Sequence, residues 1–245
     1  MNLNYKTVEY YDKVYKDIKG TDVTLEELKL IKSIVNKKAK LLDVACGTGR
    51  HLIPLVKLGY QVTGIDSSRG MIQVLNKKLK AHTANPTASI VNQNFYKFKK
   101  SEKFDVIYLM WNAFNEIALT KKDATKLLSK SKSMLNKNGK ILINIDNVNN
   151  LHLPNINGTL IVHEKNMQYR SDWKVKSFVR KTNTTKSIEW IRVYNKDKKI
   201  FDEKALIKQR WWSLSEIRSM AKMLDLKTKT VRLKSNRELY IILSK

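Results

Sequence analysis

The stretch "LLDVACGTGRHL", residues 41–52, runs from an apolar segment into a turn with two glycines. Its first half, extended to "KLLDVA", predicts a buried strand, and "RHLIPLVKLG" predicts a helix that ends at Gly59. A strand that enters a helix through such a turn presents free backbone N–H groups, and glycines let a ligand approach the main chain closely. We therefore expect the turn at Gly47 and Gly49 to bind a nucleotide-like ligand.

Two phosphate-binding motifs do not fit this turn. The dinucleotide motif needs a third glycine where Leu52 stands, and a Walker loop needs Lys and Ser/Thr after Gly49, where the chain has Arg and His. Instead, Asp43 precedes the turn and Asp66 ends the next predicted strand, "YQVTGID". A carboxylate at the second position can accept both hydroxyls of a ribose. Asp43 would repel a diphosphate and attract an ammonium group, so the pattern fits S-adenosylmethionine.

Predicted strands and helices alternate over the first 150 residues. Spacing of apolar residues predicts two leading helices, from Val8 to Ile18 and in "TDVTLEELKLIKSIV". Beyond residue 60 we expect the strand "YQVTGID", the helix "SRGMIQVLNKKLKAH", the strands "ASIVNQN" and "FDVIYLM", a helix from about Asp123 to Leu135, the turn "NKNG" and the strand "KILINID". This alternation predicts an α/β fold with a parallel sheet covered by helices on both faces.

The pattern changes after Asn150. Four short alternating runs, "GTLIVHEKN", "WKVKSFVRKT", "SIEWIRVYN" and "EKALIKQRWW", predict three or four antiparallel strands that form a lid. The segment "SLSEIRSMAKMLD" then predicts a helix with a capping box from Ser213 to Glu216, followed by two closing strands. We expect one domain: leading helices (1–36), a cofactor-binding core (37–150), an inserted antiparallel lid (151–212), and a closing helix and strands (213–245).

The segment "LLDVACGTGRHLIPLVKLGYQVTGIDSS" resembles the first two motifs of the class I S-adenosylmethionine-dependent methyltransferases. The similarity extends from "YYDKVYKD" to "RWWSLSEIRSMAKMLDL", and in detail it is to the small-molecule branch that includes sugar-amine and glycine N-methyltransferases. It implies a Rossmann-like sheet of seven strands and S-adenosyl-L-methionine as cofactor. In this chain Ala45 replaces the usual first glycine of the motif, and Asn94 replaces the usual aspartate of the adenine segment.

The resemblance also implies which residues surround the cofactor. Asp43 and the turn would hold the methionine part of the cofactor, and Asp66, with Ser67 beside it, would hold the ribose. Aromatic residues of the leading helix would cover the cofactor, and the candidates are Tyr5, Tyr11 and Tyr15. The implied cofactor-binding residues are Tyr11, Tyr15, Asp43, Ala45, Cys46, Gly47, Gly49, Asp66, Ser67, Asn94, Phe95 and Met110.

Methyl transfer from a sulfonium needs close approach of the nucleophile and a destination for its proton. Ligands of open parallel sheets meet the carboxyl ends of the strands, which directs attention to "WNAFNEI" after "FDVIYLM". Each candidate also has an alternative interpretation: the aromatic residues pack in the core, the glutamate is an acid at a helix start, and the histidines occupy ordinary surface positions. The candidates are Trp111, Asn112, Phe114 and Asn115 for substrate, Glu116, His152 and His163 as proton acceptors, and Tyr169, Arg170, Trp173, Trp190 and Arg192 in the lid.

Composition and missing motifs argue against several classes of methylation reaction. The sequence lacks the "NPPY" and "DPPY" tetrapeptides that grip a base amine, which argues against adenine-N6 methylation. Its single cysteine, Cys46, lies in the cofactor turn, which argues against pyrimidine-C5 methylation, a disulfide and a Cys-rich metal site. No apolar run approaches the length of a membrane span, and the first residues lack the apolar centre of a secretory signal, so we expect a soluble cytoplasmic protein.

The net charge of +26 leaves an RNA substrate open. Lysines and arginines outnumber acids by 26 to 13 in residues 1–150 and by 22 to 9 in residues 151–245, so no part forms a basic arm. We expect methyl transfer to nitrogen or oxygen of a small polar molecule. RNA methylation through the basic surface is the first alternative, and a non-catalytic, cofactor-binding regulatory subunit is the second.

Overall fold

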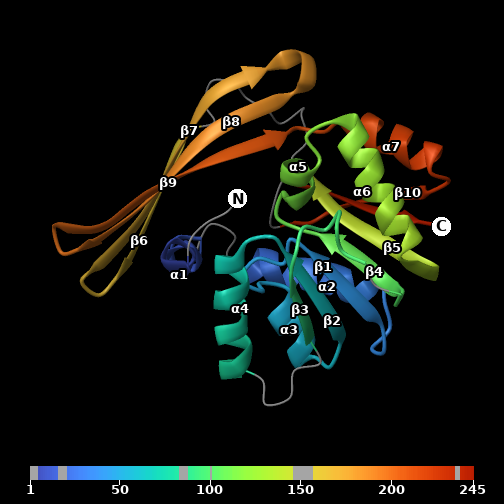
Figure 1. Ribbon diagram of the computed structural model, residues 1–245, viewed down its shortest axis with the longest axis horizontal. Coiled ribbons are helices and arrows are strands. Elements are labelled where there is room, and N and C mark those ends of the chain that lie inside the picture. Colours follow the sequence, from blue (N-terminus) through green and yellow to red (C-terminus); the bar gives the residue numbers. More distant parts are fainter. Residues whose placement is uncertain (1–4, 16–20, 83–87, 100, 146–156, 235–237) are drawn as a thin grey trace.

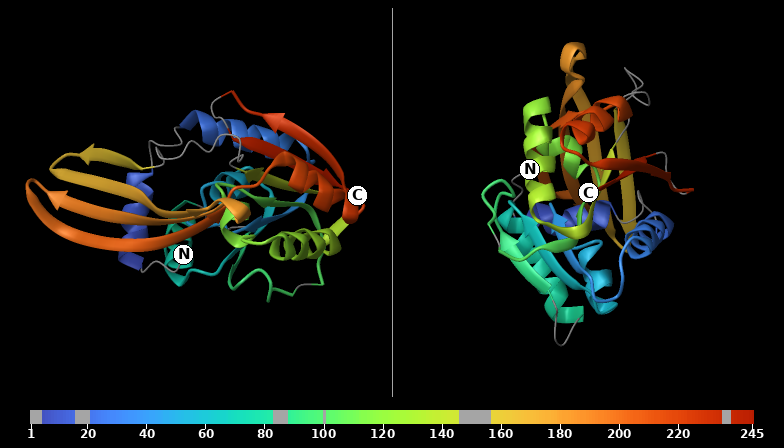
Figure 2. Two further views of the ribbon diagram at one scale, coloured as in Figure 1. Left: turned by 90° about the horizontal axis from the view of Figure 1, so that it is seen from above. Right: turned by 90° about the vertical axis from the view of Figure 1, so that its right-hand side faces the viewer.

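The protein folds around two β-sheets (Figure 1). The computed structural model describes residues 5–15, 21–82, 88–99, 101–145, 157–234 and 238–245. A seven-stranded sheet forms the centre, and a separate four-stranded antiparallel sheet extends from it (Figure 2). The predicted α/β fold with an antiparallel addition is confirmed.

The seven-stranded sheet has the order that the alternating pattern requires. Strands β1 to β5 run parallel, and β11 is antiparallel to both of its neighbours. The central strands are buried almost throughout because helices cover both faces, which explains their nearly continuous apolar sequences. From edge to edge the strands are β10 (Lys227–Arg232), β11 (Leu239–Ser244), β5 (Leu135–Ile145), β4 (Phe104–Leu109), β1 (Lys40–Val44), β2 (Gln61–Asp66) and β3 (Ala88–Asn92).

Helices pack against this sheet in two layers. One apolar core joins it to α5 (Ala113–Ile117), α6 (Lys121–Ser133) and α7 (Leu214–Met223). A second core joins its other face to α2 (Thr21–Ser33), α3 (Leu52–Lys57) and α4 (Arg69–His82). The capping box at α7 is present as predicted, with Ser213 and Glu216 each bonded to the other's backbone N–H.

The antiparallel sheet consists of β6 (Gly158–Glu164), β7 (Met167–Val179), β8 (Thr184–Asn195) and β9 (Lys198–Arg210). Short connections join them, including the 3₁₀ turn Arg180–Thr182. Helix α1 (Tyr5–Val14) lies between this sheet and α4 (Figure 2). Val14 and Tyr10 pack on the sheet with Tyr169 and Phe201, so α1 links the two halves of the molecule.

One predicted boundary is wrong. The "NKNG" turn at residues 136–139 is not a break before the fifth strand, because β5 already begins at Leu135. Phe104 pairs with Leu135 and Val106 with Lys140, so the ladder takes up the extra residues as an irregularity.

Candidate active site

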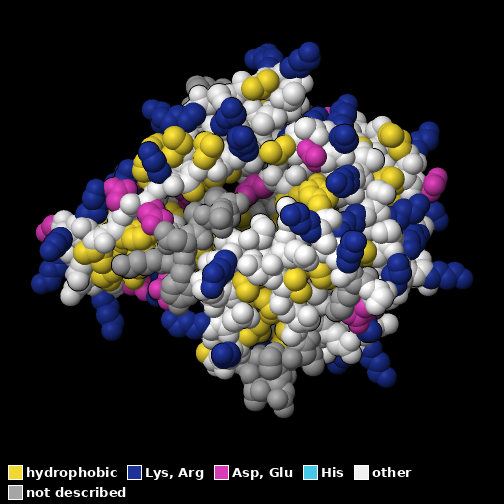
Figure 3. All heavy atoms as spheres, in the orientation of Figure 1, with side chains coloured by type: hydrophobic (Ala, Val, Ile, Leu, Met, Phe, Trp, Pro, Cys, Tyr) yellow, Lys and Arg dark blue, Asp and Glu magenta, His cyan; other side chains and the backbone are white. Residues whose placement is uncertain are grey.

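A cavity of about 860 Å³ lies at the carboxyl ends of the parallel strands. Residues after β1, β2, β3 and β4 form its floor, and residues of α1, β8 and β9 close it from the other side. The space-filling view shows a hollow between the two parts of the molecule, with acidic side chains beside it (Figure 3). Of the residues proposed from sequence, the cavity is lined by Tyr11, Tyr15, Asp43, Ala45, Cys46, Gly47, Asp66, Ser67, Asn94, Phe95, Met110, Trp111 and Glu116.

The two glycines of the turn have different structural roles. Gly47 has φ +54°, and a Cβ there would meet nothing closer than 4.0 Å, so it leaves the backbone open toward the cavity. Gly49 has φ +87°, and a Cβ there would lie 2.3 Å from Leu75 of α4. Gly49 does not line the cavity but lets the turn pack closely on α4. Ala45 also has positive φ, +60°, although it carries a Cβ.

Two buried acids stand beside the turn. Asp66 accepts hydrogen bonds from the N–H groups of Gly47 at 2.9 Å and Ser68 at 2.8 Å, which fixes its carboxylate at the end of β2. Burial raises the pKa of Asp66 despite these bonds. Burial raises the pKa of Asp43 to about 8, with Asp66 adding to the rise and the neighbouring Tyr108 opposing it. A cationic ligand would therefore be favoured beside Asp43.

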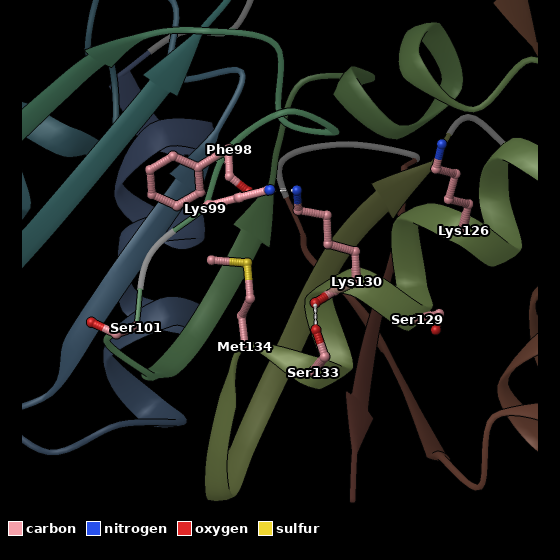
Figure 4. Close-up of a pocket in the computed structure, with 8 residues that line it drawn as sticks. All are labelled: Phe98, Lys99, Ser101, Lys126, Ser129, Lys130, Ser133 and Met134. Carbon is pink, nitrogen blue, oxygen red and sulfur yellow. Dashed lines mark hydrogen bonds between the residues drawn. The ribbon is translucent and has the colours of Figure 1, made fainter.

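The segment after β3 forms the wall where the adenine is expected. Asn94 lines the cavity, and its Oδ1 accepts the N–H of Tyr96 at 2.8 Å, while Phe95 is buried. Lys130 of α6 donates to the carbonyls of Tyr96 at 2.9 Å and Phe98 at 2.6 Å, and its Nζ lies 5.2 Å from the Phe95 ring centroid. Lys130 thus braces this wall from behind, where it borders a basic surface depression (Figure 4).

Aromatic rings form the side of the cavity between α1 and β4. Tyr11 and Tyr15 are one helical turn apart, with ring centroids separated by 4.5 Å. The ring of Trp111 meets Tyr15 edge-on at 5.7 Å. The side chain of Tyr5 lies outside the described residues, whereas Tyr10 faces the antiparallel sheet.

Two carboxyl groups from outside the glycine turn also line the cavity. Glu116 comes from α5, and the buried Glu189 comes from β8, where it accepts the Ser171 hydroxyl at 2.6 Å and the Tyr15 hydroxyl. Burial raises the pKa of both, that of Glu116 to about 7, and the negative charges of Glu189 and Asp66 add to the rise at Glu116. Among the described residues no ion pair with Lys or Arg is found at either carboxyl group, so the pair can receive a cation or a proton.

Several predicted residues lie away from this cavity. Asn112 and Asn115 do not line it, because the chain turns through left-handed conformations at Trp111 and Asn112 and buries Asn115 below. His163 is exposed on β6. His152 lies outside the described residues. Phe114 belongs to the apolar core. The candidates on the antiparallel sheet have other contacts: Tyr169 packs on α1, and Arg170 and Arg192 pair with Asp172. Trp190 lies near Lys176, and Trp173 packs on Gly158.

Other lining residues were not predicted. Asp12 of α1 accepts the Thr48 hydroxyl at 2.6 Å and pairs with Lys78, which fastens α1 over the turn. Glu189 had no local sequence signal because strand pairing alone brings it to the cavity. Arg50 follows the turn directly, and that position was a usable signal. The remaining additions are Thr24, Val44, His51, Ile65, Met71, Gln93, Tyr96, Ala113, Ile117 and the β9 residues Leu206, Ile207, Lys208 and Gln209.

Neither a membrane span nor a metal centre is found in the parts of the chain that the structure describes. No helix there is long and apolar enough to cross a bilayer. No three His, Cys, Asp or Glu side chains gather there in an arrangement that could hold a metal ion.

Comparison with curated proteins finds partial relatives. A ubiquinone biosynthesis O-methyltransferase from Pelagibacter ubique is 36% identical over 97 residues, which cover 39% of this chain and 40% of the relative. A dTDP-3-amino-3,6-dideoxy-alpha-D-glucopyranose N,N-dimethyltransferase from Streptomyces fradiae is 30% identical over 113 residues, 45% of this chain and 42% of the relative. The chain thus aligns with less than half the length of either relative.

A solved structure matches over the whole chain. The structure of the amino pentose methyltransferase CalS10 from Micromonospora echinaspora, with S-adenosylmethionine bound, has a TM-score of 0.77 at 16% identity and covers 100% of this chain and 99% of that chain. At this identity the match shows the fold. Residues 41–139 match the family model described as a methyltransferase domain. Residues 41–139 therefore match a methyltransferase domain, in agreement with the expectation from the glycine turn and its two acids, and the whole chain shares the fold of a solved methyltransferase.

Proposed function

We propose that this protein transfers a methyl group from S-adenosylmethionine to a small polar molecule, with an amine nitrogen as the acceptor. The observation that carries this proposal is that one cavity is lined by two chemically different groups of residues. The first group is the glycine turn with Asp43 and Asp66, and the second is Glu116 with Glu189. Such a cavity can hold a donor and an acceptor side by side.

In the first group, each residue suits one part of the cofactor. Asp43 would face the ammonium of its tail, and the open backbone at Gly47 would allow close contact. Asp66 keeps oxygen lone pairs for the ribose hydroxyls after bonding two backbone N–H groups. The rings of Tyr11 and Tyr15 would cover the ligand and exclude water.

In the second group, the two carboxyl groups suit an amine that arrives as ammonium. One of them, as carboxylate, would take the proton of R–NH₃⁺, which frees the nitrogen lone pair for attack. The bound cofactor supplies an electrophilic methyl group: the N–C bond forms as the C–S bond breaks, and the S–C electrons remain on the thioether. A pKa of about 7 at Glu116 lets it hold or release this proton near neutral pH.

The relatives support a small-molecule acceptor. The name of the Streptomyces fradiae relative states N,N-dimethylation of an amino sugar, and CalS10 is described as an amino pentose methyltransferase. The Pelagibacter ubique relative is named an O-methyltransferase, so a hydroxyl acceptor is the second candidate. The carboxyl groups favour nitrogen because they attract a cation.

RNA is a weaker candidate. Lysine and arginine side chains are scattered over the visible face instead of forming a continuous stripe (Figure 3). The cavity itself is lined by five acidic side chains, Asp12, Asp43, Asp66, Glu116 and Glu189, and by three basic ones, Arg50, Lys78 and Lys208. Arg50 and Lys78 are already paired with acids, so the cavity offers a phosphate backbone little net attraction. We also propose that the protein is cytoplasmic and forms one domain with the antiparallel sheet as an insertion.

Incubation with methyl-labelled S-adenosylmethionine and a cell extract, separated afterwards into RNA, protein and metabolite fractions, tests this function. We expect label in the metabolite fraction, in compounds that carry an amine. Asp66→Ala should weaken cofactor binding by about 1 to 3 kcal/mol, the range for losing a hydrogen bond to a charged group. Label in RNA at 150 mM salt, or no binding of the cofactor by the wild type, would refute the proposal.

A further inference from the structure

One serine is buried in the apolar face of the antiparallel sheet. Ser171 of β7 is fully buried, two residues from Tyr169 and opposite Ile191, which both belong to the apolar cluster between this sheet and α1. A hydroxyl in such surroundings costs free energy unless it forms a hydrogen bond. Ser171 donates to Glu189 Oε1 at 2.6 Å. The hydroxyl of this buried serine is therefore directed at a residue of the cavity.

The register of the sheet brings these two side chains together. Ser171 pairs with Ile191, and Trp173 pairs with Glu189, so Ser171 and Glu189 are diagonal neighbours on one face of the sheet. Glu189 lines the cavity, whereas Ser171 does not. Any effect of Ser171 on a ligand must therefore pass through its neighbours, of which Glu189 is the charged one.

One oxygen of Glu189 is occupied and the other is available. Oε1 accepts the hydroxyl of Ser171 from within the sheet and the hydroxyl of Tyr15 from α1. No hydrogen bond to Oε2 is found in the part of the chain that the structure describes. The carboxyl group is thus fixed through one oxygen and keeps the second for a ligand of the cavity.

The described groups that face Glu189 carry no positive charge. Across the sheet it pairs with Trp173 of β7 and Ala205 of β9, neither of which titrates. The titratable groups near it are Glu116 of α5 and Tyr11 and Tyr15 of α1. A second carboxyl group and two phenols do not compensate a negative charge at Glu189.

Hydrogen bonds therefore favour the carboxylate form of Glu189 in place of an ion pair. Burial raises its pKa, and the hydroxyls of Ser171 and Tyr15 oppose that rise, because a donor to the carboxylate stabilises the charged form. Tyr15 belongs to α1, whereas Ser171 belongs to the same sheet as Glu189. The serine is thus the donor that the sheet itself supplies.

We propose that Ser171 is a positioning residue of the acceptor site, which holds Glu189 as a carboxylate with Oε2 left for the acceptor amine. This inference rests on the proposed function. Without the serine hydroxyl, Glu189 would be neutral in a larger fraction of molecules. A neutral carboxyl group would neither attract an ammonium nor take its proton.

NMR of isotope-labelled glutamate carboxyl carbons tests the inference without a substrate. Glu189→Gln and Glu116→Gln identify the two signals. In Ser171→Ala the apparent pKa of Glu189 should rise by about one pH unit, which is tenfold in proton affinity, because a hydrogen bond to the charged form is lost. Glu116 should then titrate at lower pH than in wild type, because the charge of Glu189 raises the pKa of Glu116.

Methyl transfer provides a second measurement. With labelled S-adenosylmethionine and the metabolite fraction of a cell extract, Ser171→Ala should be up to about tenfold slower on the acidic side of the pH profile. It should approach the wild-type rate at high pH, where Glu189 is ionised again, and its affinity for S-adenosylhomocysteine should stay within about twofold. Ser171→Thr keeps the hydroxyl and should restore the titration and the profile, and Ser171→Cys, a weaker donor, should lie in between.

The control is another hydroxyl–carboxylate bond of the same sheet. Thr159→Ala removes the bond of 2.6 Å from Thr159 to Asp172, outside the cavity, and should leave the titration of Glu189 unchanged. Thermal unfolding identifies the variants that fold. A wild-type titration of Glu189 in folded Ser171→Ala or Ser171→Cys would overturn the inference. Failure of wild type to bind S-adenosylmethionine or S-adenosylhomocysteine would instead refute the proposed function, and the titration would still show whether Ser171 keeps Glu189 ionised.

Discussion

The two halves of the cavity are built in different ways. The floor comes from the ends of β1, β2, β3 and β4, where the chain turns from strand to helix within a few residues. The opposite side comes from α1, from Glu189 in the middle of β8 and from the last residues of β9, and the residues of β8 and β9 lie far along the chain from the glycine turn. The floor therefore depends on local turn geometry, and the opposite side depends on the register of an antiparallel sheet.

This difference separates two tasks. Under the proposed function, backbone groups and two acids in the floor would recognise features that every molecule of cofactor shares. Side chains from the antiparallel sheet, above all Glu189, would meet the acceptor. Substitutions in the floor should therefore alter folding and cofactor affinity, whereas substitutions in the sheet should alter turnover.

The largest effect is expected for a glycine of the floor. Gly49→Ala adds a Cβ at 2.3 Å from Leu75 and forces a left-handed alanine, so we expect a loss of about 2 to 5 kcal/mol in the free energy of unfolding. Gly59→Ala is the matched control, because φ is +86° but nothing lies within 4 Å of its added Cβ. It should lose only about 1 to 2 kcal/mol. Equal losses in urea titrations would show that backbone strain alone matters.

The sequence predicted the floor well for a physical reason. Asp43, Gly47 and Asp66 sit at strand ends within 24 residues of each other, so their spacing alone brings them to one edge of a parallel sheet. Their positions follow from local rules for strands, turns and helices.

The opposite side was harder to predict because no short-range rule places it. Glu189 reaches the cavity only through pairing of β8 with β7 and β9. Asn112 and Asn115 were misplaced because two left-handed residues after β4 change the direction of the chain. Asparagine is enriched in that conformation, but the tryptophan before it gives no signal for it. Tyr11 and Tyr15 line the cavity because of how α1 is rotated about its axis, and the sequence alone does not give that rotation.

A variant of the antiparallel sheet should affect turnover alone. Glu189→Gln keeps the size of the side chain but cannot accept a proton or attract an ammonium, so we expect kcat to fall about a hundredfold, within the range for loss of acid–base catalysis. Affinity for S-adenosylhomocysteine should stay within about twofold. Glu164→Gln, on β6 and paired with Lys13 outside the cavity, is the control. Normal turnover in Glu189→Gln would remove this carboxyl group from the reaction.

Cofactor affinity should depend on pH through Asp43. In the empty protein its pKa is about 8, and an ammonium group beside it would lower that value, so binding at pH 6 to 8 must expel a proton. Affinity should therefore rise with pH up to about 8, by at most about tenfold per unit. Calorimetry in buffers with different ionisation enthalpies would detect the released proton. In Asp43→Asn this slope should disappear; if it persists, Glu116, with a pKa of about 7, is the group responsible.

The smallest effect is expected for Cys46, although it lies in the turn itself. Burial raises the pKa of its thiol, so the thiolate needed for covalent attack is not formed near neutral pH. Its Sγ packs beside Gly64 of β2, where a Cβ would come within 3.0 Å of it. Cys46→Ser should therefore keep kcat within about twofold and change the free energy of unfolding by about 1 kcal/mol, the usual size for a point substitution. If turnover were lost while S-adenosylhomocysteine still bound, the floor would contribute chemistry as well as recognition, and the division between the two halves of the cavity would fail.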